Sequence, residues 1–303
     1  MTGPDTVPGP RQWLDPAVLA RLGSLELKAR VIVEGFLQGL HRSPFKGFSV
    51  EFAEYRPYLP GDDPASIDWR AYARSDRYYV KRFEQETNLP CHLLVDVSAS
   101  MGYGSGPLTK LQYGTYLAAA LAYLLSRQRD AVGLMAFDHD IRVHLPPSTR
   151  PRHVRSLIVA LDALRPGARS DLSRPLHRLA SAIERRGLVV VISDLLDDPD
   201  RVIEGLRHVR FRGMEVIVFQ LLDHAELTFP FGGPTRFRDL ESAAEVVTVP
   251  AEVREEYLRR LGGLTGRYAR ALPAAGVDYT LIDTAQPLHV ALLAYLAARR
   301  RVM

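Results

Sequence analysis

Short apolar runs alternate with amphipathic stretches along the part of the chain that follows Pro90. The apolar runs are rich in β-branched side chains, which predicts strands buried on both faces. We place these strands at 91–97, 131–137, 188–193, 214–221 and 277–283. Apolar positions three and four residues apart predict helices at 109–128, 151–164, 172–186, 199–211, 250–272 and 286–302. This alternation predicts an α/β fold with a mainly parallel, doubly wound sheet. Residues 139–146 and 235–249 are expected to form shorter edge strands joined by turns.

A different pattern occupies the first part of the chain. Asp15 and Pro16 open a helix that is expected to run to about Leu40. Residues 43–85 then combine four prolines and ten aromatic residues in irregular order. An irregular segment this apolar needs a surface to pack on. We therefore divide the chain into 1–88, a helix with an aromatic-rich leader, and 89–303, the α/β domain. The leader is expected to dock on the domain through Trp69 and neighbouring aromatic residues.

Composition narrows the class of protein. The 303 residues are 47% hydrophobic and 24% charged, which is typical of a folded globular protein. The net charge of +4 is the small excess of 39 basic over 35 acidic residues, and the basic residues, 35 arginines and 4 lysines, are scattered along the chain. A nucleic-acid footprint needs basic residues gathered on one face, so no nucleic-acid partner is expected.

The sequence also favours a location. A single cysteine, Cys91, excludes an internal disulfide and fits a reducing compartment. The first twelve residues contain an aspartate and three prolines, where a secretory signal needs an apolar stretch. The longest apolar run, about 117–125, is half of what a membrane-spanning helix needs. We expect a cytoplasmic protein with no transmembrane segment.

Candidate ligand-binding residues are concentrated where the first buried strand ends. The run CHLLVDVSASMG, residues 91–102, places Asp96, Ser98 and Ser100 at every second position after the apolar residues. In open α/β sheets, ligands bind beyond the carboxyl ends of the strands, which is where these side chains fall. A carboxylate and two hydroxyls are hard oxygen donors that suit Mg²⁺, Mn²⁺ or Ca²⁺.

Two later segments complete a candidate ligand shell. Asp194 follows the strand at 188–193, and it reaches the same sheet edge if the two strands are neighbours. The loop before the helix at 172 offers the hydroxyl of Ser170 and the carboxylate of Asp171. Both residues could instead cap that helix, and Asp194 could cap the helix at 199. Mg²⁺ keeps several water ligands, so such a shell leaves a position for an oxygen of a partner.

This arrangement resembles the metal-ion-dependent adhesion site of von Willebrand factor A domains. The resemblance implies that Asp96, Ser98 and Ser100 are the ligands from the first loop. It further implies that Ser170 replaces the usual threonine of the second loop and that Asp194 is the acid of the third loop. Asp171 stays a rival to Ser170.

The resemblance extends into the leader. The segments FAEYRPYLPGDD (52–63), IDW (67–69) and VKRFE (80–84) are similar to the leader of the bacterial domain-of-unknown-function family fifty-eight. The similarity covers nearly all of residues 40–285. It implies association with an AAA+ ATPase of the MoxR type, in chaperone-like assembly or maturation of a client protein.

The leading hypothesis is a non-enzymatic, metal-dependent protein-interaction module in which a client's Asp or Glu completes the coordination of the ion. The alternative is a metal-dependent phosphohydrolase with Asp96 as nucleophile. That chemistry usually uses a second acid two residues later, where this chain has Ser98. An RNA-binding module of the von Willebrand factor A type is the least favoured hypothesis, because the basic residues of the chain do not gather in one stripe.

Overall fold

The computed structural model describes residues 15–41, 55–57, 78–81, 89–169, 171–182, 185–242 and 244–299. The chain divides into two compact units, one made of residues 1–39 with 89–303 and the other of residues 40–88. In the second unit, the strands β1 (Tyr55–Pro57) and β2 (Tyr79–Lys81) pair antiparallel. Trp69 lies outside the described residues. The docking of the leader and the division at residue 88 therefore stay predictions.

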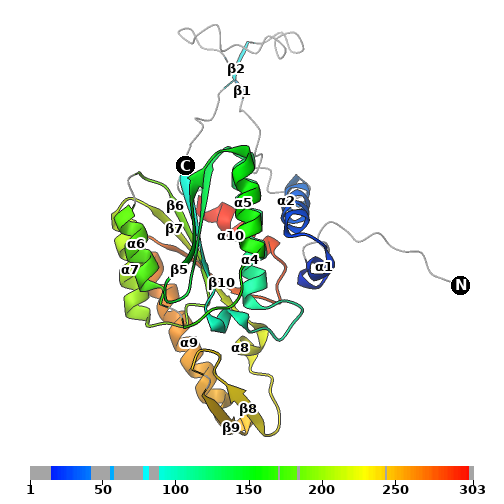
Figure 1. The fold of residues 1–303 in the computed structure, drawn as a ribbon, viewed down its shortest axis with the longest axis vertical. Helices are drawn as coiled ribbons and strands as arrows, with labels where there is room; N and C mark the ends of the chain where they lie inside the picture. The colour runs from blue at the N-terminus through cyan, green and yellow to red at the C-terminus, as the bar shows by residue number, and fades with distance from the viewer. Residues whose placement is uncertain are drawn as a thin grey trace, which may run out of the picture. The chain divides into compact units, whose positions relative to one another are not determined.

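Six strands form the sheet of the first unit (Figure 1). They are β3 (Pro90–Asp96), β4 (Ala131–Phe137), β5 (Ile141–Ser148), β6 (Leu188–Ser193), β7 (Glu215–Leu222) and β10 (Asp278–Asp283). Their order is β10-β7-β6-β3-β4-β5, and every neighbouring pair is parallel except β4 with β5. The five strands expected from the apolar runs are present, and the expected edge strand at 139–146 is β5. The predicted α/β class with a mainly parallel sheet is confirmed.

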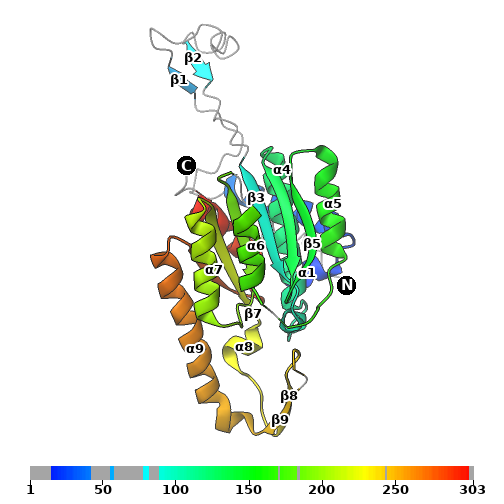
Figure 2. The same cartoon turned by 60° about the vertical axis from the view of Figure 1, so that its left-hand side comes forward.

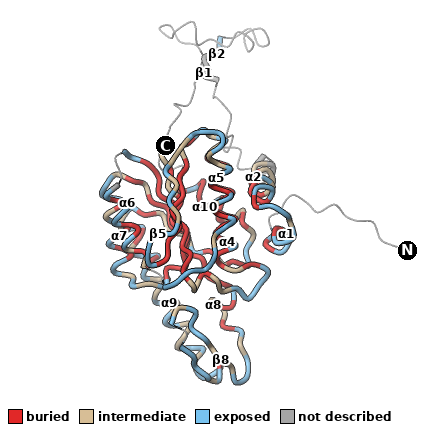
Figure 3. The backbone as a smooth tube through the Cα atoms, in the orientation of Figure 1, coloured by how far each residue is buried: buried red, intermediate tan, exposed pale blue. Residues whose placement is uncertain are grey.

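Helices cover both faces of this sheet and keep its apolar strands from water (Figure 1). One face carries α4 (Lys110–Arg127), α5 (Pro151–Asp162) and α10 (His289–Arg299). The other carries α6 (Ser173–Ala182), α7 (Pro199–Phe211) and α9 (Pro250–Ala274). Buried residues follow most of the length of the central strands, as Figure 3 shows. The fold therefore matches the expected layers, with helix ends within a few residues of the predicted ones.

The helix α4 is the most enclosed helix of the face it covers. Fourteen of its 18 residues are buried, so it packs against neighbours on several sides. Gly114 allows α4 to approach the sheet closely, because a Cβ at this position would lie 3.0 Å from Ile192 Cγ2 and 3.2 Å from Leu221 Cδ1. This close packing fixes the first turn of α4 over the carboxyl ends of β6 and β7.

The N-terminal helix differs from the prediction. Instead of one helix from Pro16 to Leu40, the chain forms α1 (Pro16–Arg21) and α2 (Leu25–His41). Leu22 adopts an extended backbone, and the Ser24 hydroxyl accepts from the Leu27 amide at 3.3 Å to open the second helix. A glycine between them further weakens helical continuity. The Lys28 ammonium of α2 donates to the Tyr116 hydroxyl of α4 at 2.6 Å, which joins α2 to the domain.

Residues 235–249 do not form an edge strand of the main sheet. They fold into β8 (Thr235–Arg238) and β9 (Glu245–Thr248), which pair antiparallel in a sheet of their own. Most side chains of these strands are exposed, so they lack the apolar face that packing into the main sheet requires. Figures 1 and 2 show this hairpin and the first turns of α9 beyond the carboxyl ends of the parallel strands, past α8 (His224–Thr228).

We expect a pH-dependent stability that originates at His92 of β3. Burial and the charge of His144 lower the pKa of His92 to about 4, below the value of about 6.5 in an unfolded chain. Between these values only the unfolded chain binds a proton at this position. The free energy of unfolding should therefore fall as the pH falls from about 6.5 to about 4, by on the order of 2 kcal/mol.

Urea unfolding of the native chain and of His92→Gln at pH 7 and pH 4.5 measures this contribution. The native chain should lose more stability than the variant between these pH values, because the glutamine does not titrate. Taking the difference between the two proteins removes the contributions of all other groups. Equal losses in both proteins would contradict the prediction.

Candidate metal centre

The candidate site lies where the strand order of the sheet reverses. From β3 the chain continues to β4 and β5 on one side and later fills the other side with β6, β7 and β10. Such a switch point leaves a crevice beyond the carboxyl ends of the two central strands. Asp96 ends β3 and Asp194 follows β6, and these strands are parallel neighbours in which Val95 pairs with Ile192. The predicted neighbourhood of the two acids is confirmed.

Asp96 is fully buried, and hydrogen bonds anchor its carboxylate. The Ser98 amide donates to its Oδ1 at 2.8 Å, and the Ser193 hydroxyl donates to its Oδ2 at 2.6 Å. Burial and the neighbouring Asp194 carboxylate raise the pKa of Asp96 to about 7. A carboxylate held in this way has a fixed orientation.

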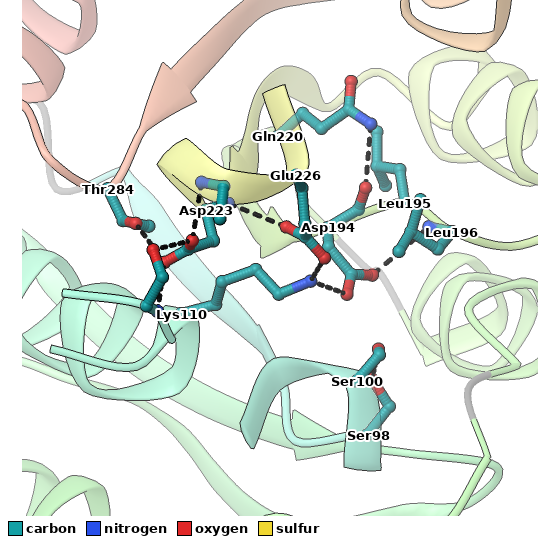
Figure 4. Close-up of polar contacts among 12 residues, drawn as sticks. Ser98, Ser100, Lys110, Asp194, Leu195, Leu196, Gln220, Asp223, Glu226 and Thr284 are labelled. Atoms are coloured by element: carbon teal, nitrogen blue, oxygen red, sulfur yellow. Dashed lines mark hydrogen bonds and ion pairs between the residues drawn. The ribbon is translucent and has the colours of Figure 1, made fainter. Parts of the chain in front are cut away.

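The two serines of the first loop lie together. Ser98 is fully buried, and its hydroxyl is 3.1 Å from the hydroxyl of Ser100, which is partly exposed (Figure 4). Ser98 precedes the short 3-10 helix η3 (Ala99–Gly102), but its side chain makes no capping hydrogen bond there. Thr109 caps α4 instead, in a reciprocal capping box with Gln112. Helix capping therefore does not account for this pair of hydroxyls.

Asp194 is held by a buried ion pair that the sequence analysis missed. The ammonium of Lys110, which is 0% exposed, lies 2.8 Å from Asp194 Oδ2 and 2.7 Å from Glu226 Oε1 (Figure 4). The Leu196 amide donates to Asp194 Oδ1 at 3.2 Å. Burial alone would lower the pKa of Lys110, but Asp194 and Glu226 outweigh it and raise the pKa above its ordinary value. The helix α7 is capped by Asp198, so Asp194 is not its N-cap.

A sequence signal for Lys110 existed. It is one of only four lysines and occupies the first turn of a largely apolar helix. A cation in that position opposes the helix dipole, so it needs a carboxylate partner nearby. The sequence does not indicate which carboxylates serve, because Asp194 and Glu226 are distant in the chain and only the sheet order brings them to α4.

A second missed residue positions the middle loop. Asp138, fully buried at the end of β4, accepts from the Ala168 amide at 3.1 Å and from Arg142 Nε at 2.8 Å. Gly167 lies so close that a Cβ there would be 2.5 Å from Asp138 Oδ2. The Gly167 amide also donates to the Val97 carbonyl at 2.6 Å. These contacts fasten the middle loop to the loop that follows β3.

The identity of the ligand from this loop stays a prediction. Ser170 lies outside the described residues. Asp171 accepts from the Ser173 hydroxyl at 2.8 Å and from the Arg174 amide at 3.4 Å, as a residue that caps the start of a helix does. The choice between Ser170 and Asp171 is therefore open to experiment.

The residues that are described fit a divalent cation. Two buried carboxylates and two hydroxyls form a set of hard oxygen donors, and none of the donors is a thiolate. Asp96, Asp194 and Glu226 with Lys110 carry a net charge of −2 when all four are ionised. A dication would bring that charge to zero. Within the described residues, no group of three or more His, Cys, Asp or Glu forms a metal cluster, so the hydroxyls would have to contribute.

Comparison with known proteins places the chain in a family. Residues 54–262 match the family described as "Protein of unknown function DUF58". The chain belongs to this family. Its relatives include the uncharacterized proteins Rv1480 of Mycobacterium tuberculosis and Mb1516 of Mycobacterium bovis. Each is 28% identical to this chain over 291 residues, which cover 95% of this chain and 91% of the relative.

Von Willebrand factor A domains are among the solved structures that resemble this DUF58 member distantly. Among solved structures, BatB from Bacteroides thetaiotaomicron shares 15% identity over 70% of this chain and 99% of that chain, with a TM-score of 0.45. The SpRpn10 VWA domain shares 13% over 67% and 93% (TM-score 0.39). Manganese-loaded Plasmodium vivax TRAP protein shares 15% over 70% and 74% (TM-score 0.40). Likeness at this level identifies no activity.

Lys110→Met should strongly destabilise this DUF58 chain. The substitution leaves the Asp194 and Glu226 carboxylates without their shared cation, and Asp194 is only 1% exposed. Breaking a buried ion pair by removing one partner costs about 3–5 kcal/mol. Urea unfolding in the presence of a chelator measures the loss, and the chelator prevents a bound dication from offsetting it.

Lys28→Met is the matched control, since Lys28 is also buried but its ammonium donates to a hydroxyl. That change should cost only about 1 kcal/mol. Equal losses in the two variants would show that the carboxylates do not depend on Lys110.

Proposed function

We propose that this DUF58 member is a metal-dependent protein-interaction module. In this proposal Asp96, Ser98, Ser100, Ser170 and Asp194 hold Mg²⁺, with Mn²⁺ and Ca²⁺ as alternatives. An Asp or Glu of a client protein then completes the coordination shell. The observation that carries the proposal is the convergence of Asp96, the two serine hydroxyls and Asp194 at the switch point of the sheet.

The charge of the site supports a carboxylate as the incoming ligand. A dication together with Asp96, Asp194, Glu226 and Lys110 makes a neutral centre. An anionic oxygen therefore approaches without net repulsion and gains a direct bond to the ion. The bound ion would supply a coordination position for the client's carboxylate, while Lys110 and Ser193 keep the two protein carboxylates in place.

The proposal also concerns the binding partner and the cellular compartment. We propose that the module acts with an AAA+ ATPase of the MoxR type in chaperone-like assembly or maturation of a client, as the resemblance of the leader implies. We place this action in the cytoplasm, where the single cysteine stays reduced. Among the described residues, no helix is both long enough and apolar enough to span a bilayer.

A phosphohydrolase with Asp96 as nucleophile is less well supported. Such a nucleophile must contact its substrate directly, whereas Asp96 is 0% exposed. The position two residues later is Ser98, which cannot serve as the second acid. The interaction module requires neither feature.

Asp96→Ala tests the proposed function. Loss of a direct carboxylate ligand should weaken divalent-ion binding by more than the roughly 10–100-fold that loss of an outer-shell partner costs. Folding should persist, because the change relieves the repulsion between Asp96 and Asp194. Isothermal titration with Mn²⁺ measures the affinity, and surface plasmon resonance with the MoxR-type ATPase measures partner binding.

Partner binding should weaken in the variant and, for the native chain, in the presence of a chelator. Neither protein should hydrolyse a phosphate ester. The proposal fails if partner binding is unchanged by both treatments. It also fails if the native chain shows a metal-dependent hydrolysis that Asp96→Ala abolishes.

A pair of variants identifies the second-loop ligand. If Ser170 is the ligand, Ser170→Ala should weaken Mn²⁺ binding at least tenfold, while Asp171→Ala should leave it unchanged and lower stability by about 1 kcal/mol through loss of a helix cap. The reverse pattern would assign the metal to Asp171. Titration calorimetry and urea unfolding on both variants separate the two outcomes.

A further inference from the structure

A cleft opens directly beside the candidate metal centre. Its volume is about 240 Å³, and its lining runs from Ser100 and Tyr103 in the loop before α4 to Leu240 beyond β8. Ser100 belongs to both the cleft and the proposed ligand set. Glu226 also lines the cleft, and its charge is balanced by Lys110. Whatever enters the cleft therefore lies next to the proposed ion.

Aromatic side chains form one wall of this cleft. Phe229 stacks on Phe237 with ring centroids 5.5 Å apart, and Phe231 meets both of them edge-on at 5.1 and 5.2 Å. Tyr257 of α9 lies 4.6 Å from Phe229. Phe229 has a left-handed backbone with φ of 48°, which is uncommon for a bulky residue. The cluster is thus a preformed apolar wall built from α8, the hairpin and α9.

The lining contains the acidic residues Glu226 and Asp239 and one basic residue, Arg238, which is available to a ligand. The Asp239 carboxylate accepts from the Glu241 amide and the Ser242 hydroxyl. Arg238 is exposed and lines the cleft, and within the described residues it has no hydrogen bond or ion pair. By contrast Arg236, two positions earlier on β8, pairs with Glu245 at 3.8 Å. A guanidinium with five free donors attracts a carboxylate. The cleft therefore combines an apolar wall with a positive group at one side and the proposed ion at the other.

The geometry points to a specificity site for the segment of the client that flanks its metal-binding acid. The inference rests on the proposed function. At about 240 Å³ the cleft is smaller than the roughly 300–1,000 Å³ of sites for small molecules, so it suits one large side chain. The occupant is an acidic peptide segment of a partner, with an aromatic side chain next to the Asp or Glu on the ion. The aromatic ring packs on Phe237 and Phe231, and a further carboxylate of the segment pairs with Arg238.

The test uses a displayed library of nine-residue peptides with a central Asp and random residues elsewhere, selected against the native chain in Mg²⁺. Phe, Tyr or Trp next to the Asp should be enriched, with acidic residues beyond. In Phe237→Ala the aromatic preference should disappear and the best peptide should bind at least tenfold more weakly. Phe211→Ala, at a phenylalanine that is 88% exposed on α7, should behave as the native chain.

Arg238→Gln should reduce the acidic preference several-fold, and Arg236→Gln should not. Thermal unfolding and Mn²⁺ affinity establish that each variant keeps its fold and its ion. The inference is overturned if the selected Asp peptides show no preference for particular flanking residues. It is also overturned if they show a preference that Phe237→Ala leaves intact. In both cases the proposed function stands.

Two outcomes separate the inference from the proposed function. Aromatic peptides that bind without Mg²⁺ and without Asp, and that are lost in Phe237→Ala, would support the cleft and overturn the metal-dependent function. A native dimer that Phe237→Ala converts to a monomer, seen by sedimentation, would mean that a second copy fills the cleft and would overturn the inference.

Discussion

The carboxylates of Asp96 and Asp194 lie buried together at the carboxyl ends of the two central strands. The groups around them must offset their mutual repulsion. Asp96 and Asp194 are almost completely shielded from water, where like charges repel strongly. Hydrogen bonds from Ser193 and from the backbone hold Asp96, and the ammonium of Lys110 holds Asp194. This buried network makes the first turn of α4 part of the site as much as the three loops.

The same ammonium connects the site to the region beyond the sheet. Lys110 also pairs with Glu226, whose carboxylate accepts from the Asp223 amide at the start of α8. Asp223 in turn accepts from the amide and hydroxyl of Ser105 in the loop before α4. The candidate centre, α8 and the aromatic cleft are thus joined by short polar contacts, so a ligand in the cleft and an ion at the site would meet the same side chains.

The location of the site follows from strand order rather than from any single motif. A parallel sheet whose order reverses between β3 and β6 leaves room beyond their carboxyl ends. The buried Asp138 and the close approach of Gly167 draw the middle loop to this position. Gly114 brings α4 near enough for Lys110 to reach Asp194. Small residues at close contacts therefore decide which polar groups can meet.

The sequence by itself determined the α/β class, the five strands, and the placement of Asp96, Ser98 and Asp194 at strand ends. Four of these strands are buried as predicted, whereas β10 is an edge strand and is mostly only partly buried. Apolar periodicity is local, and it records which face of each element is buried. It could not show the break at Leu22, the separate hairpin of β8 and β9, or the pairing of Lys110 with Asp194 and Glu226. The break depends on local capping, and the hairpin and the pairing depend on contacts between segments that only the packed sheet and helices bring together.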